Sequence, residues 1–437
     1  MSGDTQSSVT KINPLRGEIL IPGDKSITHR AIILSALAQG RSKILGYLPS
    51  EDCEATLRAF KAMGIRISSE LERGIPCLVV NGKGLQGLSE PENVIDCGNS
   101  GTTMRLMTGL LSAQPFFSVL TGDASLRLRP MARVMKPIRE MGGEIHARAN
   151  GNKAPLAISG TALSPIEYKL PIASAQVKSA ILLAGLRVSG TTTVIEPGPC
   201  RDHTERMFQS FGISFKKEGN ALSVSGGADF AGRSIEVPGD ISSAAFFLVA
   251  GSIIPGSEIK LCNVGVNPTR AAVLNILKKM GADIDLVFRK TTGNEPVADL
   301  KVRAAPLKGC VVEGALMTAA LDEFPILCIA AARAEGRTVF REAAELRVKE
   351  SDRIEMMASA LSGMGIAVET FPDGMAITGN PKWKGIFCKT AGDHRIAMSL
   401  VIAGLLAEGG NQIDDMACIK TSFPDFMNLL LGLTKPG

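Results

Sequence analysis

The chain is poor in aromatic residues and in histidine. Aromatic side chains make up 4% of its 437 residues, with one Trp and two Tyr among them. Single-stranded nucleic acid is commonly bound by stacking bases on aromatic side chains, so this composition argues against a nucleic-acid partner. The four histidines are far apart and form no HxxxH pair, so neither a metal nor a cofactor is expected.

Paired cysteines are also missing. The nine cysteines are scattered, without a CxxC pair, which indicates reduced thiols. The N-terminal sequence MSGDTQSSVTK lacks the apolar core of a signal peptide, and the apolar runs are shorter than a membrane span. These features predict a cytoplasmic protein.

The excess of charge is small. The net charge is +5, with 21% charged and 45% hydrophobic residues, as in ordinary globular proteins. This balance suits an anionic small molecule but lacks the basic density of a nucleic-acid-binding protein. The length predicts two or three domains.

What the chain does contain is a repeated pattern, in which a short polar cluster is followed directly by a nearly all-apolar stretch of helix length. A helix that is apolar on every side is buried, and its first turn carries unpaired N–H groups that favour anions. Six such helices predict a repeated unit whose helix starts face a shared anionic ligand. The clusters begin at Gly23, Gly98, Ser174, Gly239, Asp322 and Asp393.

A second repeated signal is a helix that ends in Met-Gly or Phe-Gly before a short β-branched segment. Glycine there supplies the left-handed conformation that ends a helix, although any single copy is an ordinary helix end. The copies lie at Gly64, Gly142, Gly212, Gly281 and Gly365, with a weaker one at Gly432.

The spacing of these signals indicates a duplication. Gly64 and Gly281 lie 217 positions apart, and IPGDKS at Ile21 returns as VPGDIS at Val237, 216 positions later. We expect two halves, each of three units of about 70–80 residues with one buried helix, one surface helix and short strands.

The last unit has too few residues, so the segment before Pro22 is predicted to supply its missing strand. The predicted domains are then 1–23 plus 239–437, a discontinuous domain, and 24–238, an inserted one. Two crossings between domains form a hinge that a ligand would close.

Polar clusters in the first half suggest an anion site. Lys25, Ser26 and Arg30 open the first buried helix, with Ser26 and Arg30 on one helical face. Two cations, a hydroxyl and a helix N-terminus suit a phosphate or carboxylate, and the alternative is a capping serine among solvated charges. Gly101 lets a ligand approach the backbone closely. Further candidates are the basic cluster Arg127, Arg129 and Arg133, then Ser174, Gln176 and Lys178, and the segment Arg201 to Glu205.

The second half is richer in acids. Asp322 and Glu323 precede a buried helix, where one carboxylate would be explained as a cap and a second is costly unless paired. The charged segment from Glu345 to Arg353 is either an exposed loop or part of the site, and Asp393 to Arg395 leads into a run without a solvated face. With Lys420, the candidates suit two multiply anionic substrates and proton transfer by carboxylates and a lysine.

At these residues the chain resembles the 5-enolpyruvylshikimate-3-phosphate synthase family. The likeness runs from about Leu15 to Phe426. The family's motifs occur in order as GDKSITHR, GNSGTTMR, RPM, SAQ, DEFP, LRVKESDR, DHRIAM and KTSFPDF. The resemblance implies an α+β (mixed α/β) fold of two domains, each of three βαβαββ repeats. It also implies transfer of the carboxyvinyl group of phosphoenolpyruvate to the 5-hydroxyl of shikimate 3-phosphate by a monomer.

The resemblance also implies roles for individual residues. Asp322 would accept the hydroxyl proton, and Glu350 and Lys25 would serve proton transfer at the methylene carbon. Shikimate 3-phosphate would be held by Lys25, Ser26, Arg30, Ser174, Gln176, Arg201, Asp322 and Lys349. Phosphoenolpyruvate would be held by Lys25, Gly101, Arg129, Gln176, Arg353, Arg395 and Lys420.

The chain departs from many family members at two positions, Leu106 in place of Pro and Ala175 in place of Ser. The motifs GDKS, SAQVK, RDHTE and NPTR resemble the class II subgroup, which tolerates the inhibitor glyphosate, whereas Gly101 is the residue of sensitive enzymes. We therefore expect intermediate tolerance, with open space beside Gly101.

Two alternatives differ in class. A sister family on the same fold transfers enolpyruvate to a UDP-amino sugar and uses a loop cysteine; it has Lys-Asn where this chain has Lys25-Ser26. Related repeats also occur in non-catalytic RNA-processing proteins, against which the low aromatic content and the paired acids count.

Overall fold

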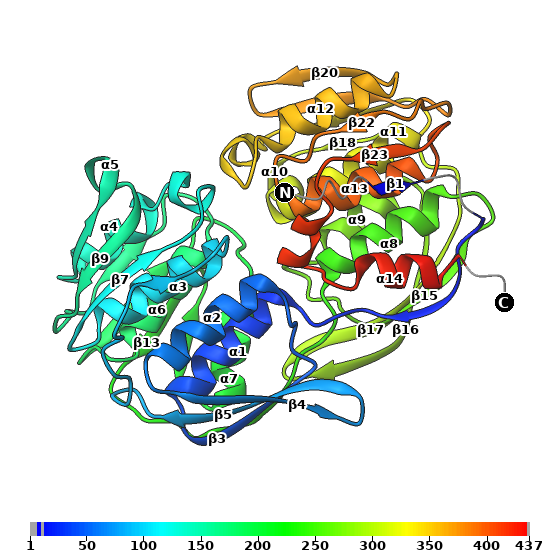
Figure 1. Cartoon of the computed structure of the whole chain (residues 1–437). Helices are drawn as coiled ribbons and strands as arrows, with labels where there is room; N and C mark the ends of the chain where they lie inside the picture. The colour runs from blue at the N-terminus through cyan, green and yellow to red at the C-terminus, as the bar shows by residue number, and fades with distance from the viewer. Residues whose placement is uncertain (1–6, 10–12, 435–437) are drawn as a thin grey trace, which may run out of the picture. The chain divides into compact units, whose positions relative to one another are not determined.

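The computed structural model describes residues 7–9 and 13–434, and these divide into two compact units. Unit 1 comprises Met1–Pro22, Pro238–Thr291 and Pro296–Gly437. Unit 2 comprises Gly23–Val237 together with the short segment Thr292–Glu295, which no sequence pattern had indicated. The elements are drawn in Figure 1.

The six apolar runs form the six predicted buried helices. Unit 2 holds three and unit 1 holds three, each buried over nearly its whole length. They are α1 (Lys25–Leu37), α3 (Gly101–Ser112), α6 (Ala175–Gly185), α8 (Ile241–Ile253), α11 (Phe324–Arg333) and α13 (His394–Gly404).

Each buried helix is followed by a second helix of its repeat. Most of these helices show one buried and one exposed face, as expected for a helix that covers a core. They are α2 (Glu51–Ala62), α4 (Ala132–Glu140), α7 (His203–Phe211), α9 (Ala272–Lys279), α12 (Arg353–Gly363) and α14 (Phe426–Gly432). Two short helices complete the set, α5 (Arg148–Gly151) and α10 (Gly314–Ala319).

Every sheet repeats one topology, in which a parallel pair of strands continues into antiparallel neighbours. Unit 2 has the orders β14-β3-β5-β4, β6-β7-β9-β8 and β10-β11-β13-β12. Its strands are β3 (Gln39–Leu45), β4 (Arg66–Glu72), β5 (Ile75–Lys83), β6 (Ile95–Asp96), β7 (Phe117–Thr121), β8 (Glu144–Ala147), β9 (Lys153–Ser159), β10 (Glu167–Lys169), β11 (Thr191–Ile195), β12 (Phe215–Glu218), β13 (Ala221–Ser225) and β14 (Ser234–Glu236).

Unit 1 has the orders β16-β17-β15-β2, β18-β19-β21-β20 and β1-β23-β22. Its strands are β1 (Ser7–Val9), β2 (Arg16–Leu20), β15 (Glu258–Gly265), β16 (Asp283–Thr292), β17 (Glu295–Arg303), β18 (Val311–Val312), β19 (Arg337–Phe340), β20 (Ala367–Phe371), β21 (Gly374–Thr378), β22 (Phe387–Cys388) and β23 (Asn411–Ile413). This mixed α/β architecture is the predicted fold class.

The N-terminal segment supplies two strands rather than one. β1 pairs antiparallel with β23 in the last repeat, where a strand from this segment was predicted. β2 instead pairs parallel with β15, and the equivalent strand β14, two residues before the second Pro-Gly-Asp, pairs parallel with β3. A strand and the buried helix that follows it thus belong to different units at both Pro-Gly-Asp sequences, which is the physical consequence of the duplication.

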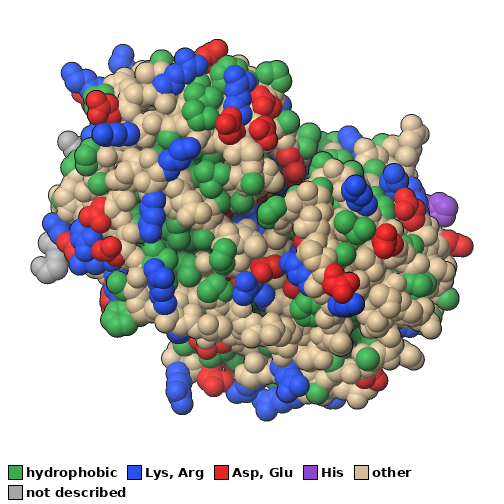
Figure 2. Space-filling model, turned by 180° about the vertical axis from the view of Figure 1, so that it is seen from behind, with side chains coloured by type: hydrophobic (Ala, Val, Ile, Leu, Met, Phe, Trp, Pro, Cys, Tyr) green, Lys and Arg blue, Asp and Glu red, His purple; other side chains and the backbone are tan. Residues whose placement is uncertain are grey.

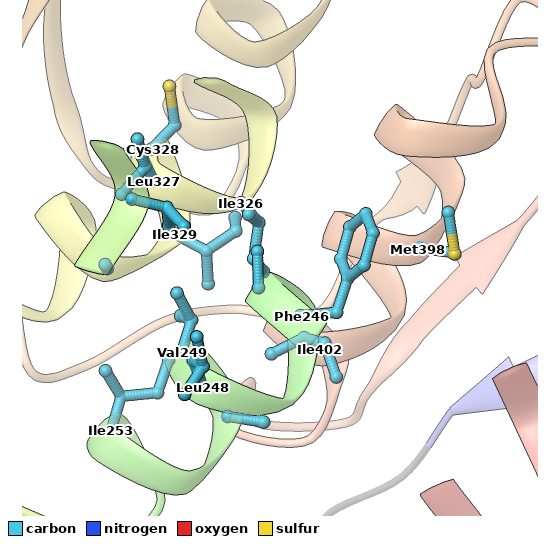
Figure 3. Packing of buried hydrophobic residues seen from close by; sticks show 14 of the residues in the cluster. Phe246, Leu248, Val249, Ile253, Ile326, Leu327, Cys328, Ile329, Met398 and Ile402 are labelled. Atoms are coloured by element: carbon cyan, nitrogen blue, oxygen red, sulfur yellow. The ribbon is translucent and has the colours of Figure 1, made fainter. Parts of the chain in front are cut away.

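Each unit has its own apolar core, built around its three buried helices. Figure 3 shows part of the core of unit 1, where side chains from α8, α11 and α13 converge, among them Phe246, Ile329 and Ile402. Since these helices present apolar side chains on all faces, their polar first turns are the parts left to carry chemistry.

The predicted glycine helix ends are confirmed at five of six positions. Gly64, Gly142, Gly212, Gly281 and Gly365 have positive φ angles of 72–93°. The sixth prediction is wrong, because Gly432 is the last residue of α14 and its φ is not positive. None of the helices in the described part of the chain is both long and apolar enough to span a bilayer.

Candidate active site

The starts of five of the six buried helices are capped by side chains that the predicted polar clusters supply. Asp24 accepts a hydrogen bond from the N–H of Ile27, and Asp393 accepts from that of Arg395. A carboxylate or hydroxyl at this position satisfies orphan N–H groups of the first turn. Ser100, Ser174 and Asp240 cap α3, α6 and α8 in the same way. Ser26 is therefore not the cap of α1, and its side chain remains available for a ligand.

In unit 2, the first cluster holds its cations in fixed positions. The Lys25 ammonium lies 2.7 Å from the Asp52 carboxylate, and both side chains keep a small exposed area. Arg30 is buried and donates to the Thr204 hydroxyl at 2.8 Å and the Ser179 hydroxyl at 2.7 Å. Asp52 was not among the predicted site residues, because it lies in the first turn of α2 without any recognisable motif.

The surroundings of Arg30 destabilise the charged form of its guanidinium. Burial lowers its pKa to about 10, and although the carboxylates of Glu205 and Asp24 oppose this fall, the nearby Arg201 cation adds to it. A bound anion would stabilise both cations, because it offsets their mutual repulsion and the loss of solvation. The half-buried Arg201 thus lies near enough to Arg30 to act on its pKa.

Around Gly101, side chains from two helices and a loop form a second polar group. The Gln176 amide accepts from Arg105 at 2.8 Å and donates to Thr102 at 3.0 Å. Arg129 is buried and donates to the Asn99 amide at 2.6 Å. The alternative of a solvated surface fits Arg127, which is exposed, but not Arg129. Asn99 and Arg105 belong to the site although no role had been assigned to them.

The expected open space beside Gly101 is wrong. A Cβ atom built there would lie 2.8 Å from Arg105 Nη1 and 3.2 Å from Arg129 Nη1. The absence of a side chain at Gly101 is what allows two guanidinium groups to approach the first turn of α3.

In unit 1, the acids before α11 act differently from the expected cap. Asp322 and Glu323 lie in a 3-10 turn, η2 (Leu321–Glu323), and neither side chain caps α11. The Asp322 carboxylate, 21% exposed, lies 3.9 Å from Lys349 Nζ and 3.8 Å from Arg353 Nη1. Arg395 donates to the Asp322 carbonyl at 2.9 Å. Asp322 is thus an acid that a ligand can reach, with two cations beside its carboxylate.

Arg353 links this acid to the start of α13. Its buried guanidinium binds the Asp393 carboxylate at 2.8 Å and the Glu350 carboxylate at 2.7 Å. Burial disfavours the cation, but Asp393 and Glu350 outweigh this and raise the pKa of Arg353. Burial likewise disfavours the Asp393 carboxylate, and Arg353 overcomes it, so the pKa of Asp393 is lowered. Arg353, at the start of α12, is therefore buried and does not belong to an exposed loop.

The remaining predicted residues lie on short elements of unit 1. Lys349 follows the 3-10 turn η3 (Ala344–Val348) and also pairs with Glu345 at 3.3 Å. Lys420 is exposed on the 3-10 turn η4 (Ala417–Thr421), which packs on α13, the helix that carries Arg395. In unit 2 the turn η1 (Leu126–Leu128) directly precedes Arg129.

One group of side chains in the described chain has the spacing of a metal site, Glu70, Glu72 and Cys77. The Lys43 ammonium lies 2.7 Å from Glu72 and 3.9 Å from Glu70, and burial raises the pKa of the Cys77 thiol. A lysine beside both carboxylates and a protonated thiol do not fit a metal ion, which needs deprotonated ligands.

The cysteines near the motifs are poor nucleophiles. Cys97 and Cys200 are buried, and burial raises the pKa of both thiols, that of Cys200 to about 12. The thiolate is the reactive form, so neither thiol suits nucleophilic cysteine chemistry.

Charged side chains of both signs are interspersed on the face seen in Figure 2, without a continuous basic patch.

Comparison with known proteins shows the family of the chain. Residues 9–430 match the family described as "EPSP synthase (3-phosphoshikimate 1-carboxyvinyltransferase)". The chain is 52% identical over 428 residues to 3-phosphoshikimate 1-carboxyvinyltransferase of Citrifermentans bemidjiense, which covers 98% of this chain and 99% of that relative. It is 53% identical over 416 residues to the enzyme of the same name from Geobacter sulfurreducens, with 95% and 96% covered.

Solved structures show the same fold. EPSP synthase from Acinetobacter baumannii is similar with a TM-score of 0.86 at 46% identity, covering 98% of both chains. The enolpyruvyl transferase NikO from Streptomyces tendae has a TM-score of 0.78 at 15% identity, covering 98% of this chain and 97% of that one, a likeness of fold alone. The chain belongs to the EPSP synthase family, the 3-phosphoshikimate 1-carboxyvinyltransferases.

Proposed function

We propose that this chain performs the carboxyvinyl transfer of the shikimate pathway with Asp322 as the base that accepts the proton of the substrate hydroxyl. The observation that carries this role is the position of Asp322. Its carboxylate is partly exposed and lies beside Lys349 and Arg353. The backbone carbonyl of Asp322 accepts a hydrogen bond from Arg395, which holds the turn in place. A carboxylate that is reachable, flanked by cations and fixed in this way suits general base catalysis.

In the proposed reaction, the 5-hydroxyl oxygen of shikimate 3-phosphate forms a bond to C2 of phosphoenolpyruvate while C3 gains a proton. The bond from C2 to the phosphate oxygen then breaks, C3 loses a proton, and the enol ether and phosphate result. Lys25 and Glu350 serve the transfers at C3. Both side chains keep 17% exposed area, and each is held by a charged partner, Asp52 and Arg353 respectively.

We further propose that the two substrates share the cations described above. Arg30, Arg201 and Lys349, with Ser26, Ser174 and Gln176, bind shikimate 3-phosphate. Arg129, Arg353, Arg395 and Lys420, with Lys25, Gly101 and Gln176, bind phosphoenolpyruvate. Neutralising the phosphate by several cations makes it a better leaving group, because negative charge develops on it in the transition state.

The alternative sister activity on a UDP-amino sugar lacks support in this site. Enzymes of the sister family use a cysteine on a loop, whereas Cys97 and Cys200 are buried and their thiols are held protonated.

We also propose a cytoplasmic monomer, in keeping with nine cysteines of which none forms a disulfide. Light scattering at several protein concentrations tests the monomer.

The role of Asp322 is tested with Asp322→Asn, which keeps the shape of the side chain but removes the base. We expect kcat for phosphate release to fall by about 10²–10⁴-fold, the range for general acid–base groups, with KM for shikimate 3-phosphate within about threefold. The matched control is Asp373→Asn in the same unit, an acid that pairs with Arg341 on the β20–β21 turn. It should keep at least about half of the turnover. Turnover near the parent value in Asp322→Asn would remove Asp322 from this role.

A further inference from the structure

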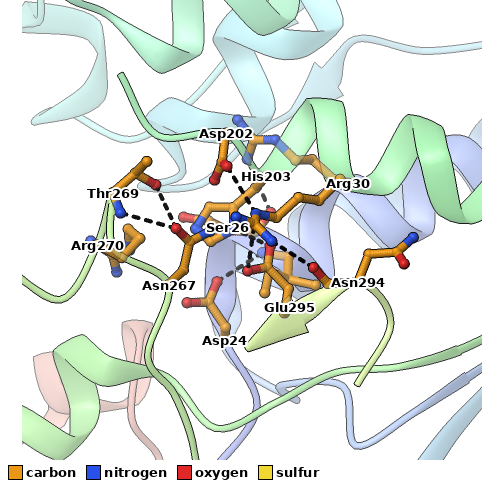
Figure 4. A network of polar contacts seen from close by, with 12 residues as sticks. Asp24, Ser26, Arg30, Asp202, His203, Asn267, Thr269, Arg270, Asn294 and Glu295 are labelled. Carbon is orange, nitrogen blue, oxygen red and sulfur yellow. Dashed lines mark hydrogen bonds and ion pairs between the residues drawn. The ribbon is translucent and has the colours of Figure 1, made fainter. Parts of the chain in front are cut away.

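The NPTR sequence (Asn267–Arg270) takes no part in the proposed reaction, yet it forms a hydrogen-bonded turn between β15 and α9 in which Asn267 and Arg270 are buried. The Asn267 side-chain oxygen accepts from the Thr269 N–H at 3.0 Å and from the Thr269 hydroxyl at 2.9 Å, as Figure 4 shows. The Asn267 carbonyl also accepts from the N–H of Arg270 at 2.8 Å. This turn fixes the direction in which Arg270 leaves the backbone.

The Arg270 guanidinium, 3% exposed, connects the starts of two buried helices of unit 1. Its Nη2 donates to the Ser242 hydroxyl at 2.7 Å and lies 3.3 Å from the carboxylate of Asp240, the cap of α8. Its Nη1 lies 3.8 Å from the carboxylate of Glu323, which also accepts the Ser242 hydroxyl. One buried cation therefore contacts both the start of α8 and the turn η2 before α11.

Stability alone is a poor explanation of this network. Replacing a buried ion network by well-packed apolar side chains is often neutral or stabilising, whereas removing one member is costly. Glu323 is 1% exposed, and one of its carboxylate oxygens has no hydrogen-bond partner in the described structure. A buried carboxylate held in this way fixes a position rather than adding net stability.

The position that it fixes is that of its neighbour Asp322. The turn η2 has three residues and no side-chain cap, so its orientation depends on tertiary contacts. The side chain of Glu323 is held by Ser242 and Arg270, and the carbonyl of Asp322 is held by Arg395. A catalytic base works only within about 0.5 Å of its productive geometry, so a loosened turn would cost turnover without touching the substrates.

We propose that Arg270 and Glu323 are positioning residues that hold the Asp322 carboxylate for proton transfer, an inference that rests on the proposed role of Asp322. The variants Glu323→Gln and Arg270→Lys test it, since each keeps approximate shape. For Glu323→Gln we expect kcat to fall by about 10–100-fold with KM for both substrates within about threefold, the pattern of an interaction that matters only in the transition state. Arg270→Lys should show the same pattern with a smaller loss.

A double-mutant cycle with Asp322→Asn separates positioning from general destabilisation. If Glu323 acts through Asp322, adding Glu323→Gln to Asp322→Asn should change kcat by less than about twofold, because the base is already gone. Rates are measured with enzyme in excess over substrate, so that slow turnover is counted, and are normalised to the fraction of enzyme that binds shikimate 3-phosphate. The control is Glu196→Gln, a buried acid beside Lys178 in unit 2, which should lose less than about twofold.

The two hypotheses fail differently in this experiment. A parent-like kcat in Asp322→Asn removes the base and with it the basis of this inference. An inactive Asp322→Asn together with a parent-like Glu323→Gln overturns only the positioning role. A loss for Glu323→Gln that is equally large with and without Asp322, or equalled by Glu196→Gln, shows that the network acts on stability alone.

Discussion

At the scale of single residues, the crowding beside Gly101 has a consequence for inhibitor binding. The missing side chain lets Arg105 and Arg129 reach the first turn of α3, and both contacts are made by the far ends of flexible side chains. A methyl group there would displace these ends by a few tenths of an ångström rather than disrupt the fold. The proposed phosphoenolpyruvate contact of Arg129 would then change.

For Gly101→Ala we expect weaker binding of glyphosate, which in this family competes with phosphoenolpyruvate, at some cost in KM for phosphoenolpyruvate. An affinity loss of one to two kcal/mol for the inhibitor corresponds to about tenfold or more in its inhibition constant. Gly432→Ala is the control, since nothing lies within 4 Å of a Cβ atom at that position on α14. Equal glyphosate constants for the Gly101→Ala variant and the parent would mean that Gly101 does not border the inhibitor.

At the scale of the elements, Lys178 joins three parts of the third repeat. It is fully buried on α6, with its ammonium 2.7 Å from Glu196 at the end of β11 and 2.6 Å from Glu205 on α7. Burial disfavours the ammonium, but Glu205 and Glu196 outweigh it and raise its pKa. Lys178 was predicted as a ligand candidate, whereas in the structure it forms buried ion pairs inside unit 2.

We predict that Lys178→Met destabilises unit 2 by about 3–5 kcal/mol, because two buried carboxylates are left without their cation. Urea unfolding followed by circular dichroism measures the change. The triple variant that adds Glu196→Gln and Glu205→Gln should recover more than half of the loss, since its buried groups are neutral. A loss below about 1 kcal/mol for Lys178→Met would contradict the proposed energetics.

At the scale of the whole molecule, the proposed substrate contacts come from both units. The chain passes between the units at the two predicted places, Pro22–Gly23 and Val237–Pro238, and also at either end of the short segment Thr292–Glu295. Cations and helix N-termini on both units gain from a shared anion only when they approach one another. We therefore predict that shikimate 3-phosphate makes the protein more compact. Small-angle scattering with and without the ligand measures the radius of gyration. An unchanged radius at saturating ligand, from an open starting form, would count against this hinge.

Much of the fold followed from patterns that are local in the chain. The six all-apolar runs could only be buried helices, and their polar starts supplied the caps Asp24, Ser100 and Asp393, because helix periodicity and capping depend on residues a few positions apart. The Met-Gly helix ends and the 216-residue echo likewise indicated the duplicated repeats. The prediction for Gly432 was wrong because the neighbouring residues alone do not distinguish a glycine that ends a helix from one that belongs to it.

Only the tertiary structure decided which charges meet. Glu323 turned inward to Arg270 instead of capping α11, Asp52 came to Lys25 from another helix, and two arginines filled the space beside Gly101. These outcomes depend on contacts between residues tens of positions apart, where a buried charge takes whichever partner offsets its desolvation. The sequence by itself determined the repeats, the buried helices and the residue types of the site. The pairing of its charges, and with it the placement of Asp322, arose from packing three repeats around one core.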